Sequence, residues 1–479
     1  MTICAKRSGT TINFGPWIDS GPQRRPAIFR FQTVVAVLTL ITMLFVGGAP
    51  LFTAEEQHPP IVIIAVDTLR ADRLGCYGYW RPTSPEVDAM AEDAILFSRC
   101  FTPSPLTTPA FASLMTSMPP HRHGAKRNGL PIFPKVGTLA DILKSMGYRT
   151  GAFISSWPLK AKLSGLDRGF DTYGEVFDKK RWLGTINPEG RAPTVNEKVF
   201  DWLDRNAGEP IFLWVHYSEP HAPYLHHKAF DFGYNRWHKE RYHPDSDLRK
   251  MRNYDTEVGF VDHHIGRLID RLRQDGLYRR ACVVFMSDHG ESFGEHGEFG
   301  HGRRLFNSTL HVPLMVKLPG NRRAGTELRH AVSLEDVAPT LLHLLKQDRP
   351  EWMVGQDLFI RQENRALFAE AYKGAVHFVH GRYYHHKVEP IRYSMVQGGG
   401  KLILSPRSHR YRFFEWSTDT LERHNLYMQR RSGLKAWQRK LGNYIRRVEE
   451  YLRISKKFVR KPGQMTKEDM DKLKTLGYF

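Results

Sequence analysis

The chain has 479 residues, a formal net charge of +20 and an isoelectric point near 9.7. Its 41% hydrophobic and 25% charged residues exclude a disordered or fibrous protein, and its length allows one large domain with a smaller second one. The positive charge indicates a surface that meets anions, and nucleic acid, anionic lipid and acidic glycan all qualify. Charge alone does not choose among them.

The N-terminal 54 residues combine a basic segment with an apolar one. Five basic residues and a single acidic one precede an almost wholly apolar run over 34–52. This pattern predicts a basic cytoplasmic N-terminus over 1–33 and a transmembrane signal anchor over 34–54, with the rest of the chain in the periplasm or outside the cell. A cleaved signal peptide is the alternative, but its one plausible site, at 47–49, is followed by proline.

Buried strands are predicted over 61–66, 211–217, 282–287 and 312–318, where short apolar runs occur. Helices are predicted between them, over 85–93 with Ser84 as its cap, over 138–146, and over 254–274. This alternation predicts an α/β fold with a doubly wound, mostly parallel sheet, which we assign to a catalytic domain over 60–346. In such sheets, ligands bind outside the carboxyl ends of the strands.

Asp67 directly follows the first of these strands, and Asp288 and His289 follow the third. Carboxylate and imidazole groups delivered to one edge of a sheet are suitable ligands for a divalent metal ion. One imidazole in the set favours zinc or manganese over calcium or magnesium, whose usual ligands are all oxygen. A lone aspartate would more often cap a helix or form a salt bridge, so the prediction depends on the three residues together.

Thr107 and Thr108 precede Pro109, which suits the first position of a helix, with Thr108 as its cap. The helix dipole then favours an anion beside Thr107. A threonine hydroxyl is too weakly acidic to attack at neutral pH unless a cation stabilises the alkoxide, so Thr107 is a candidate nucleophile and metal ligand only if the metal site exists. Otherwise both threonines are simply capping residues.

Two histidines are further candidates for substrate binding or proton transfer. His221 follows the second strand between two prolines, and His301 lies twelve residues past His289 in a glycine-rich loop. We expect His221 to contact the anionic group under attack and His301 to hold a substrate oxygen or act as general acid. His216, inside the second strand, is expected in the core.

The C-terminal third changes in character. Polar and aromatic segments predict a smaller α+β subdomain with an antiparallel sheet over 350–426, and a basic helical segment is predicted over 427–479. Contact of this segment with anionic lipid is an alternative to a simply solvated basic face. Nucleic acid is not expected as a partner, because the chain is predicted to be exported and lacks a recognised binding motif.

Four cysteines, at positions 4, 76, 100 and 282, are too few for a disulfide scaffold. Cys282 opens an apolar run and is expected in the core. Cys76 and Cys100 either pair or stay free, and the sequence leaves both alternatives open.

Several motifs resemble the sulfatase branch of the alkaline phosphatase superfamily, over most of the chain from Ile61 to Phe479. They include VDTLRADRLGCYGY, TTPAFASLMTSMPPHRHG, FLWVHYSEPHAPY, SDHGESFGEHGEFGHG and KLKTLGYF. The resemblance implies an alkaline phosphatase-like fold, a divalent metal and an anionic ester substrate that is lipid-linked or glycan-linked.

The sequence departs from the sulfatase pattern at the nucleophile. Sulfatases carry Cys-x-Pro-x-Arg or its serine version, whose first residue is oxidised to formylglycine, whereas this chain has Thr107 and, two residues after Pro109, Phe111. No formylglycine is therefore expected. The pairs Asp67-Thr68 and Asp288-His289 are more similar to phosphoethanolamine transferases and metallo-phosphatases, in which a zinc-bound threonine is the nucleophile.

Hydrated formylglycine expels sulfate from its own second hydroxyl, a route that is closed to threonine. We therefore expect a metal-dependent hydrolase or transferase of phosphoesters (phosphomonoester, phosphodiester or phosphoethanolamine type) with Thr107 as nucleophile. A sulfuric ester hydrolase without formylglycine is one alternative. A catalytically inactive binder of anionic glycan or lipid is another, from a different functional class.

Overall fold

The structure of the chain is a computed structural model that describes residues 58–177, 181–182, 185–186, 189–233, 243–372, 378–379, 382–383 and 389–455. Among these residues, none of the helices has both the length and the apolar composition needed to cross a bilayer. The predicted anchor over 34–54 and the basic segment over 1–33 lie outside the described residues, as does the chain beyond 455.

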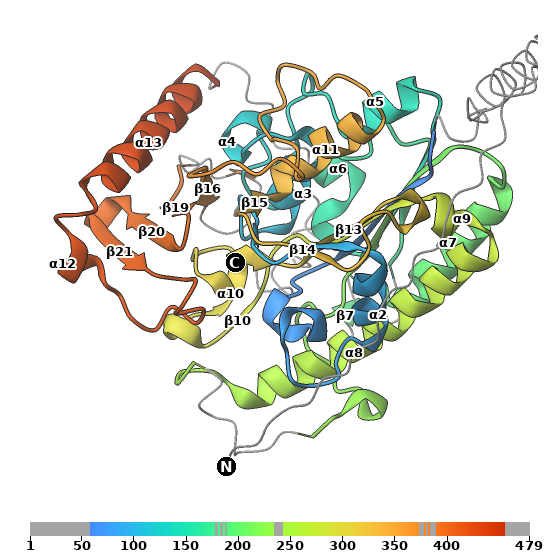
Figure 1. Cartoon of the computed structure of the whole chain (residues 1–479), viewed down its shortest axis with the longest axis horizontal. Coiled ribbons are helices and arrows are strands. Elements are labelled where there is room, and N and C mark those ends of the chain that lie inside the picture. The colour runs from blue at the N-terminus through green and yellow to red at the C-terminus, as the bar shows by residue number, and fades with distance from the viewer. Residues whose placement is uncertain are drawn as a thin grey trace, which may run out of the picture. The chain divides into compact units, whose positions relative to one another are not determined.

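A mixed sheet of eight strands lies at the centre of the part from residue 58 onward (Figure 1). Its strand order is β14-β2-β13-β9-β1-β8-β4-β5. The strands are β1 (Ile61–Val66), β2 (Ile95–Phe97), β4 (Arg149–Ile154), β5 (Thr172–Glu175), β8 (Ile211–Tyr217), β9 (Cys282–Ser287), β13 (Leu314–Lys317) and β14 (Thr326–Leu328).

Both faces of this sheet are buried, which explains why its central strands are continuous apolar runs. Alternate residues of β1 point to opposite sides. Ile61 and Ile63 pack with α3 (Thr107–Thr116), α5 (Leu139–Ser145) and α11 (Val337–Leu344). Val62 and Ile64 pack with α2 (Pro85–Asp93), α7 (Ala192–Arg205) and α8 (Leu248–Gln274). The result is a three-layer arrangement of helices, sheet and helices.

The predicted direction of one strand is wrong. The apolar run over 312–318 was expected to be parallel, but β13 pairs antiparallel with β9, with Leu314 opposite Met286. An apolar run encodes burial and not direction. The connection from β9 holds only short elements before it re-enters the sheet, without the long crossover helix that a parallel return requires.

The helix bounds agree with the sequence patterns in two cases and differ in a third. Helix α2 covers the predicted residues, and α5 begins after Thr138, whose hydroxyl accepts the Asp141 N–H in a capping box. Helix α8 begins six residues earlier than predicted, where the Asp247 side chain accepts two backbone N–H groups. The first turns of α8 are basic and carry little apolar periodicity, so their sequence gave no helical pattern.

A second, four-stranded antiparallel sheet has the order β16-β19-β20-β21. Its strands are β16 (Ala366–Ala371), β19 (Arg392–Gln397), β20 (Gly400–Ser405) and β21 (Arg410–Phe414). Helix α13 (Lys435–Ser455) packs on this sheet through Leu441, Tyr444 and Val448, so the apolar stripe of the basic helix is covered (Figure 1). The Glu370 N–H donates to the Pro103 carbonyl and links this sheet to the segment before α3.

The remaining elements are short. Strands β3 (Cys100–Phe101), β12 (His311–Val312) and β15 (Val332–Ser333) form a three-stranded sheet, and three two-stranded pairs are β6 (Arg181–Trp182) with β7 (Thr185–Ile186), β10 (Ser292–Phe293) with β11 (Phe299–Gly300), and β17 (Phe378–Val379) with β18 (Arg382–Tyr383). The short helices are α4 (Pro120–His123), α6 (Ala161–Ser164), α9 (Leu277–Arg280), α10 (Asn307–Leu310) and α12 (Tyr427–Arg430). Cys76, Cys100 and Cys282 are free thiols, so Cys76 and Cys100 do not pair.

Candidate active site

The strand register brings the three predicted metal ligands together. Val66 of β1 pairs with Ser287 of β9, so Asp67 and Asp288 leave neighbouring strands at the same level. One ligand atom each from Asp67, Asp288 and His289 lies within 4.8 Å of the others, and all three side chains are fully buried. The His289 Nε2 is 3.3 Å from Asp288 Oδ2 and 3.9 Å from Asp67 Oδ1.

The tautomer of His289 is fixed by its own loop. Its Nδ1 donates to the Gly290 carbonyl at 3.0 Å, which leaves the lone pair of Nε2 directed at the carboxylates. Burial, and then the neighbouring His301, lowers the pKa of His289 well below its usual value. The lone pair of a neutral imidazole thus faces two carboxylates. Three acceptors placed together in this way are suited to bind a cation.

The two carboxylates carry buried oxygens that the described residues do not satisfy. Neither oxygen of Asp67 nor Oδ2 of Asp288 has a hydrogen-bond donor among the described residues. Burial raises the pKa of Asp67 well above its usual value, with the charge of Asp288 adding to it, and burial raises the pKa of Asp288 to about 7. These unsatisfied groups fit a divalent cation held by Asp67, Asp288 and His289.

Thr107 lies next to these candidate metal ligands. Its Oγ1 is 3.3 Å from His289 Nε2, and its side chain is fully buried. The predicted cap is wrong, because α3 begins at Thr107 itself, with Leu106 as the N-cap residue. The Thr108 N–H donates to Asn128 Oδ1 and the Thr108 hydroxyl to the Pro158 carbonyl, so tertiary contacts replace the capping bond that the local sequence offered.

The residue after Asp67 holds a left-handed backbone. Thr68 has a φ of 56°, which is unfavourable for a β-branched residue. Its N–H donates to Asp288 Oδ1 at 3.2 Å, and its carbonyl accepts the Tyr254 hydroxyl at 2.7 Å. These bonds hold the strained turn and connect the two aspartates.

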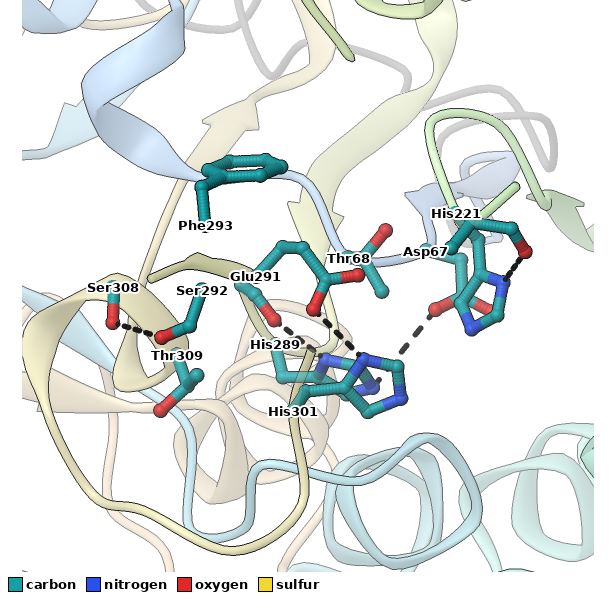
Figure 2. Close-up of polar contacts among 12 residues, drawn as sticks. Asp67, Thr68, His221, His289, Glu291, Ser292, Phe293, His301, Ser308 and Thr309 are labelled. Carbon is teal, nitrogen blue, oxygen red and sulfur yellow. Dashed lines mark hydrogen bonds and ion pairs between the residues drawn. The ribbon is translucent and has the colours of Figure 1, made fainter. Parts of the chain in front are cut away.

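His221 and His301 lie near the candidate ligands Asp67 and His289, as Figure 2 shows. The ring centroid of His301 is 4.4 Å from that of His289 and 5.3 Å from that of His221. Glu291 Oε1 is 3.2 Å from His301 Nδ1, and Glu189 Oε1 is 2.9 Å from His221 Nδ1. The long loop after β9 therefore returns His301 to the site, as predicted.

The charge state of His221 differs from that of His289. Burial opposes its imidazolium form, but Glu189, and then Asp67 and Glu291, outweigh burial and raise the pKa of His221 to about 10. His221 is therefore a cation next to the candidate metal ligands at neutral pH, before any ion is bound. A cationic imidazole there suits a negatively charged substrate.

The site opens into a cavity of about 830 Å³. His221, Glu291 and His301 line it, together with residues from the start of α8, the loop 297–304 and β19. His301 thus lines this cavity and also lies against His289.

Sequence reasoning missed several polar residues of the site. His216 was expected in the core; it is fully buried in β8, but its Nε2 lies 3.7 Å from Asp67 Oδ2. Glu189 and Glu291 orient the rings of His221 and His301, respectively. Asn128 accepts the Thr108 N–H at the start of α3, and its buried Nδ2 has no partner among the described residues. Only Glu291 had a sequence signal, because it lies two residues after His289.

Comparison with known proteins agrees with the sulfatase resemblance of the sequence motifs. The sulfatase family model matches residues 59–347, and the model "N-sulphoglucosamine sulphohydrolase, C-terminal" matches residues 294–450. An uncharacterized sulfatase, YidJ, of Escherichia coli strain K12 is 25% identical over 66% of this chain and 73% of its own length. An ulvan-active sulfatase of Formosa agariphila is 27% identical over 64% of this chain and 66% of its own length.

Solved structures agree with this fold. The "putative sulfatase yidJ" from Bacteroides fragilis, a crystal structure, has a TM-score of 0.69 and 19% identity, covering 84% of this chain and 100% of that one. The phosphonate monoester hydrolase of Agrobacterium radiobacter has a TM-score of 0.59 and 19% identity, covering 82% and 96%. Together with the family model, which matches more than half of the chain, these results show that the chain belongs to the sulfatase family, a hydrolase family of the alkaline phosphatase superfamily.

Proposed function

We propose that this protein is a metal-dependent phosphoester hydrolase or phosphoryl transferase in which Thr107 is the nucleophile. The observation that carries the proposal is the position of Thr107 Oγ1, 3.3 Å from His289 Nε2 and at the start of a helix. A divalent cation, zinc or manganese by the mixed oxygen and nitrogen donors, would stabilise the threonine alkoxide when bound by Asp67, Asp288 and His289.

The residues of the chain then act in sequence. Thr107 Oγ1, after losing its proton to solvent, forms a bond to phosphorus while the bond to the leaving alcohol breaks, and His301 gives the leaving oxygen a proton. Glu291 holds Nδ1 of His301, which orients the ring for this transfer. Cationic His221 binds a non-bridging oxygen of the group under attack. In the second step His301 takes a proton from water or from an acceptor alcohol, whose oxygen attacks phosphorus while the bond to Thr107 Oγ1 breaks.

Sulfuric ester hydrolysis is the second candidate, and the names of the relatives favour it. Both curated relatives described above are sulfatases, and one acts on ulvan. The phosphonate monoester hydrolase among the structural neighbours has the same fold with a phosphorus-containing substrate. We prefer phosphoryl transfer because threonine lacks the second hydroxyl through which formylglycine hydrate releases sulfate.

The test replaces the nucleophile and keeps the rest of the site. Thr107→Ala is expected to lower kcat on the order of a thousandfold or more while metal stays bound, whereas Thr107→Ser retains a hydroxyl and measurable turnover. The assay compares 4-nitrophenyl phosphate, a 4-nitrophenyl phosphodiester and 4-nitrophenyl sulfate, and metal content is measured on each purified variant. Full activity of Thr107→Ala rejects the nucleophile, and a clear preference for the sulfate ester selects the second candidate.

A further inference from the structure

The cavity next to the candidate active site has a basic wall. Five basic side chains line the cavity, and they come from the start of α8, the loop after His301 and β19: Arg249, Lys250, Arg303, Arg304 and Arg392. Two carboxylates, Glu291 and Glu298, also line it. Segments that are far apart in the sequence thus place their positive charges around one space.

The two carboxylates are already engaged. Glu291 Oε1 is 3.2 Å from His301 Nδ1, and Glu298 Oε2 is 2.5 Å from Arg304 Nε. Among the described residues, Arg303 and Arg392 form no ion pair with a carboxylate. The cavity therefore contains more positive charge than its own acidic residues neutralise.

The arrangement of Arg392 shows the same imbalance. Its Nη1 donates to the Arg303 carbonyl at 2.5 Å, while its buried Nε has no hydrogen-bond partner in the described part of the chain. Burial, and then the charge of Arg304, lowers the pKa of Arg392. A guanidinium held among like charges with an unused N–H is suited to bind an oxyanion through paired hydrogen bonds.

We propose that Arg303, Arg304 and Arg392 form an anion site that binds a second, non-reacting anionic group of the substrate. This inference rests on the proposed function, because the ester under attack would lie at His221, His301 and Thr107. The substrate class is then an ester whose alcohol portion carries another phosphate, sulfate or carboxylate group. The exposed ring of Phe299, with Lys250 Nζ 4.2 Å above it, gives the same cavity an apolar surface for the part that joins the two groups.

Kinetics on matched substrates test the site. A neutral 4-nitrophenyl ester is compared with anionic esters that share its reacting group and differ only in a remote anionic group. This remote group is a phosphate, a sulfate or a carboxylate, so that the preferred anion can be identified. Wild type is expected to turn over the anionic ester with kcat/KM about tenfold or more above the neutral one. Arg303→Gln and Arg392→Gln are expected to remove this preference through KM and to leave the neutral ester unchanged within about twofold.

Two variants serve as controls. Arg361→Gln makes the same change in net charge at a side chain that is 73% exposed and paired with Glu363, away from this cavity, and is expected to keep the preference. Arg392→Lys keeps the charge but loses the planar fork, so it should restore only part of the effect. Equal losses on neutral and anionic esters, or an equal loss in Arg361→Gln, overturn the anion site.

A binding measurement separates this inference from the proposed function. Calorimetry on Thr107→Ala uses the non-reacting anionic alcohol and its neutral analogue, so no turnover is needed. The double variant Thr107→Ala/Arg303→Gln is expected to bind the anionic alcohol about tenfold more weakly than Thr107→Ala does. This result supports the site even if Thr107 is not the nucleophile. Absence of binding, or equal binding with and without Arg303, overturns it whatever reaction the enzyme catalyses.

Discussion

At the scale of single residues, the proposed chemistry depends on one hydroxyl and three candidate ligands. Thr107 can be neither oxidised to formylglycine nor converted to a hydrate, so in the proposed function a group bound to it leaves by a second displacement. Both oxygens of Asp67 and Oδ2 of Asp288 are buried without a donor within the described chain, and His289 Nε2 lies 3.3 Å from Thr107 Oγ1. These buried groups fit a divalent cation on electrostatic grounds, independently of any relative.

The cost of these buried acceptors predicts a link between metal and stability. Burial raises the pKa of Asp67 because it disfavours the ionised form, so ionised Asp67 needs a nearby cation, and Asp67→Asn removes both this charge and a candidate metal ligand. Chelation is therefore expected to lower the melting temperature of wild type and to change that of Asp67→Asn much less. Thermal unfolding with and without chelator measures both.

The matched control is Asp270→Asn, whose side chain is 62% exposed and pairs with Arg273 on the surface of α8. It should respond to chelation as wild type does. A full metal-dependent shift in Asp67→Asn would show that Asp67 is not a ligand.

At the scale of elements, tertiary contacts finish what local sequence begins. Ser84 occupies the N-cap position of α2, but its side chain makes no capping bond there; its oxygen accepts the Gly75 N–H. Asp262 of α8 instead accepts the Glu86 and Val87 N–H groups at 3.0 and 2.9 Å. One long helix thus caps another, and the two stay in register beneath the sheet.

This contact gives a stability prediction. Asp262→Ala leaves two N–H groups of α2 unsatisfied and is expected to lower the free energy of unfolding by about 1–2 kcal/mol. Asp262→Asn keeps one acceptor oxygen and no charge, and burial already raises the pKa of Asp262 to about 7, so it should recover part of the loss. Urea unfolding of the three proteins tests this, and an Asn variant as unstable as the Ala variant would contradict it.

The loop after β9 depends on one close approach. A Cβ atom at Gly290 would lie 2.1 Å from the Ser308 carbonyl oxygen, so only glycine fits between His289 and the 308–309 backbone. The Gly290 N–H donates to the Thr309 carbonyl there. This contact holds the chain where it leaves His289, on the loop that later carries His301.

At the scale of the whole molecule, buried neutral histidines couple stability to pH. His123 is fully buried between Ser113 and the Ala125 N–H, and burial lowers its pKa to about 3. Since the unfolded chain takes up a proton near pH 6.5 and the folded one does not, the stabilising effect is present above that pH and is lost as pH falls. The loss is about 1.4 kcal/mol per pH unit, or about 2 kcal/mol at pH 5.

His123→Gln is therefore expected to flatten the fall in unfolding free energy between pH 6.5 and 5. Denaturant titrations at several pH values, with chelator present, measure the slope. His424→Gln, at a ring that is 75% exposed, serves as the control and should keep the wild-type slope. An unchanged slope in His123→Gln would mean that His123 is protonated in the folded protein.

The C-terminal sheet takes part in the site as well as in the fold. Arg392 of β19 lines the cavity that His221 and His301 also line, although the loop and the sheet are far apart in sequence. The membrane anchor over 34–54 and the lipid contact of the basic segment over 427–479 stay predictions, because the anchor and the end of the basic segment lie outside the described residues.

The sequence by itself predicted the layered α/β fold and the positions of the central strands, and it singled out Asp67, Thr107, Asp288 and His289, which the structure brings together. Parallel strands buried on both faces are continuous apolar runs, and the residues after such strands, among them Asp67 and Asp288, fall at one edge of the sheet. Thr107 was singled out by the helix start at Pro109. Periodicity and strand ends are local properties, which a single sequence records.

Only the tertiary structure decided the antiparallel direction of β13, the true start of α3, the place of His216 beside Asp67 and the basic wall with Arg392. Each of these depends on a partner that is distant in the chain. The type of a residue and its neighbours in sequence indicate its local structure, but not which distant charge or carbonyl it contacts. At this site, such tertiary contacts determine both the electrostatics and the proposed choice of substrate.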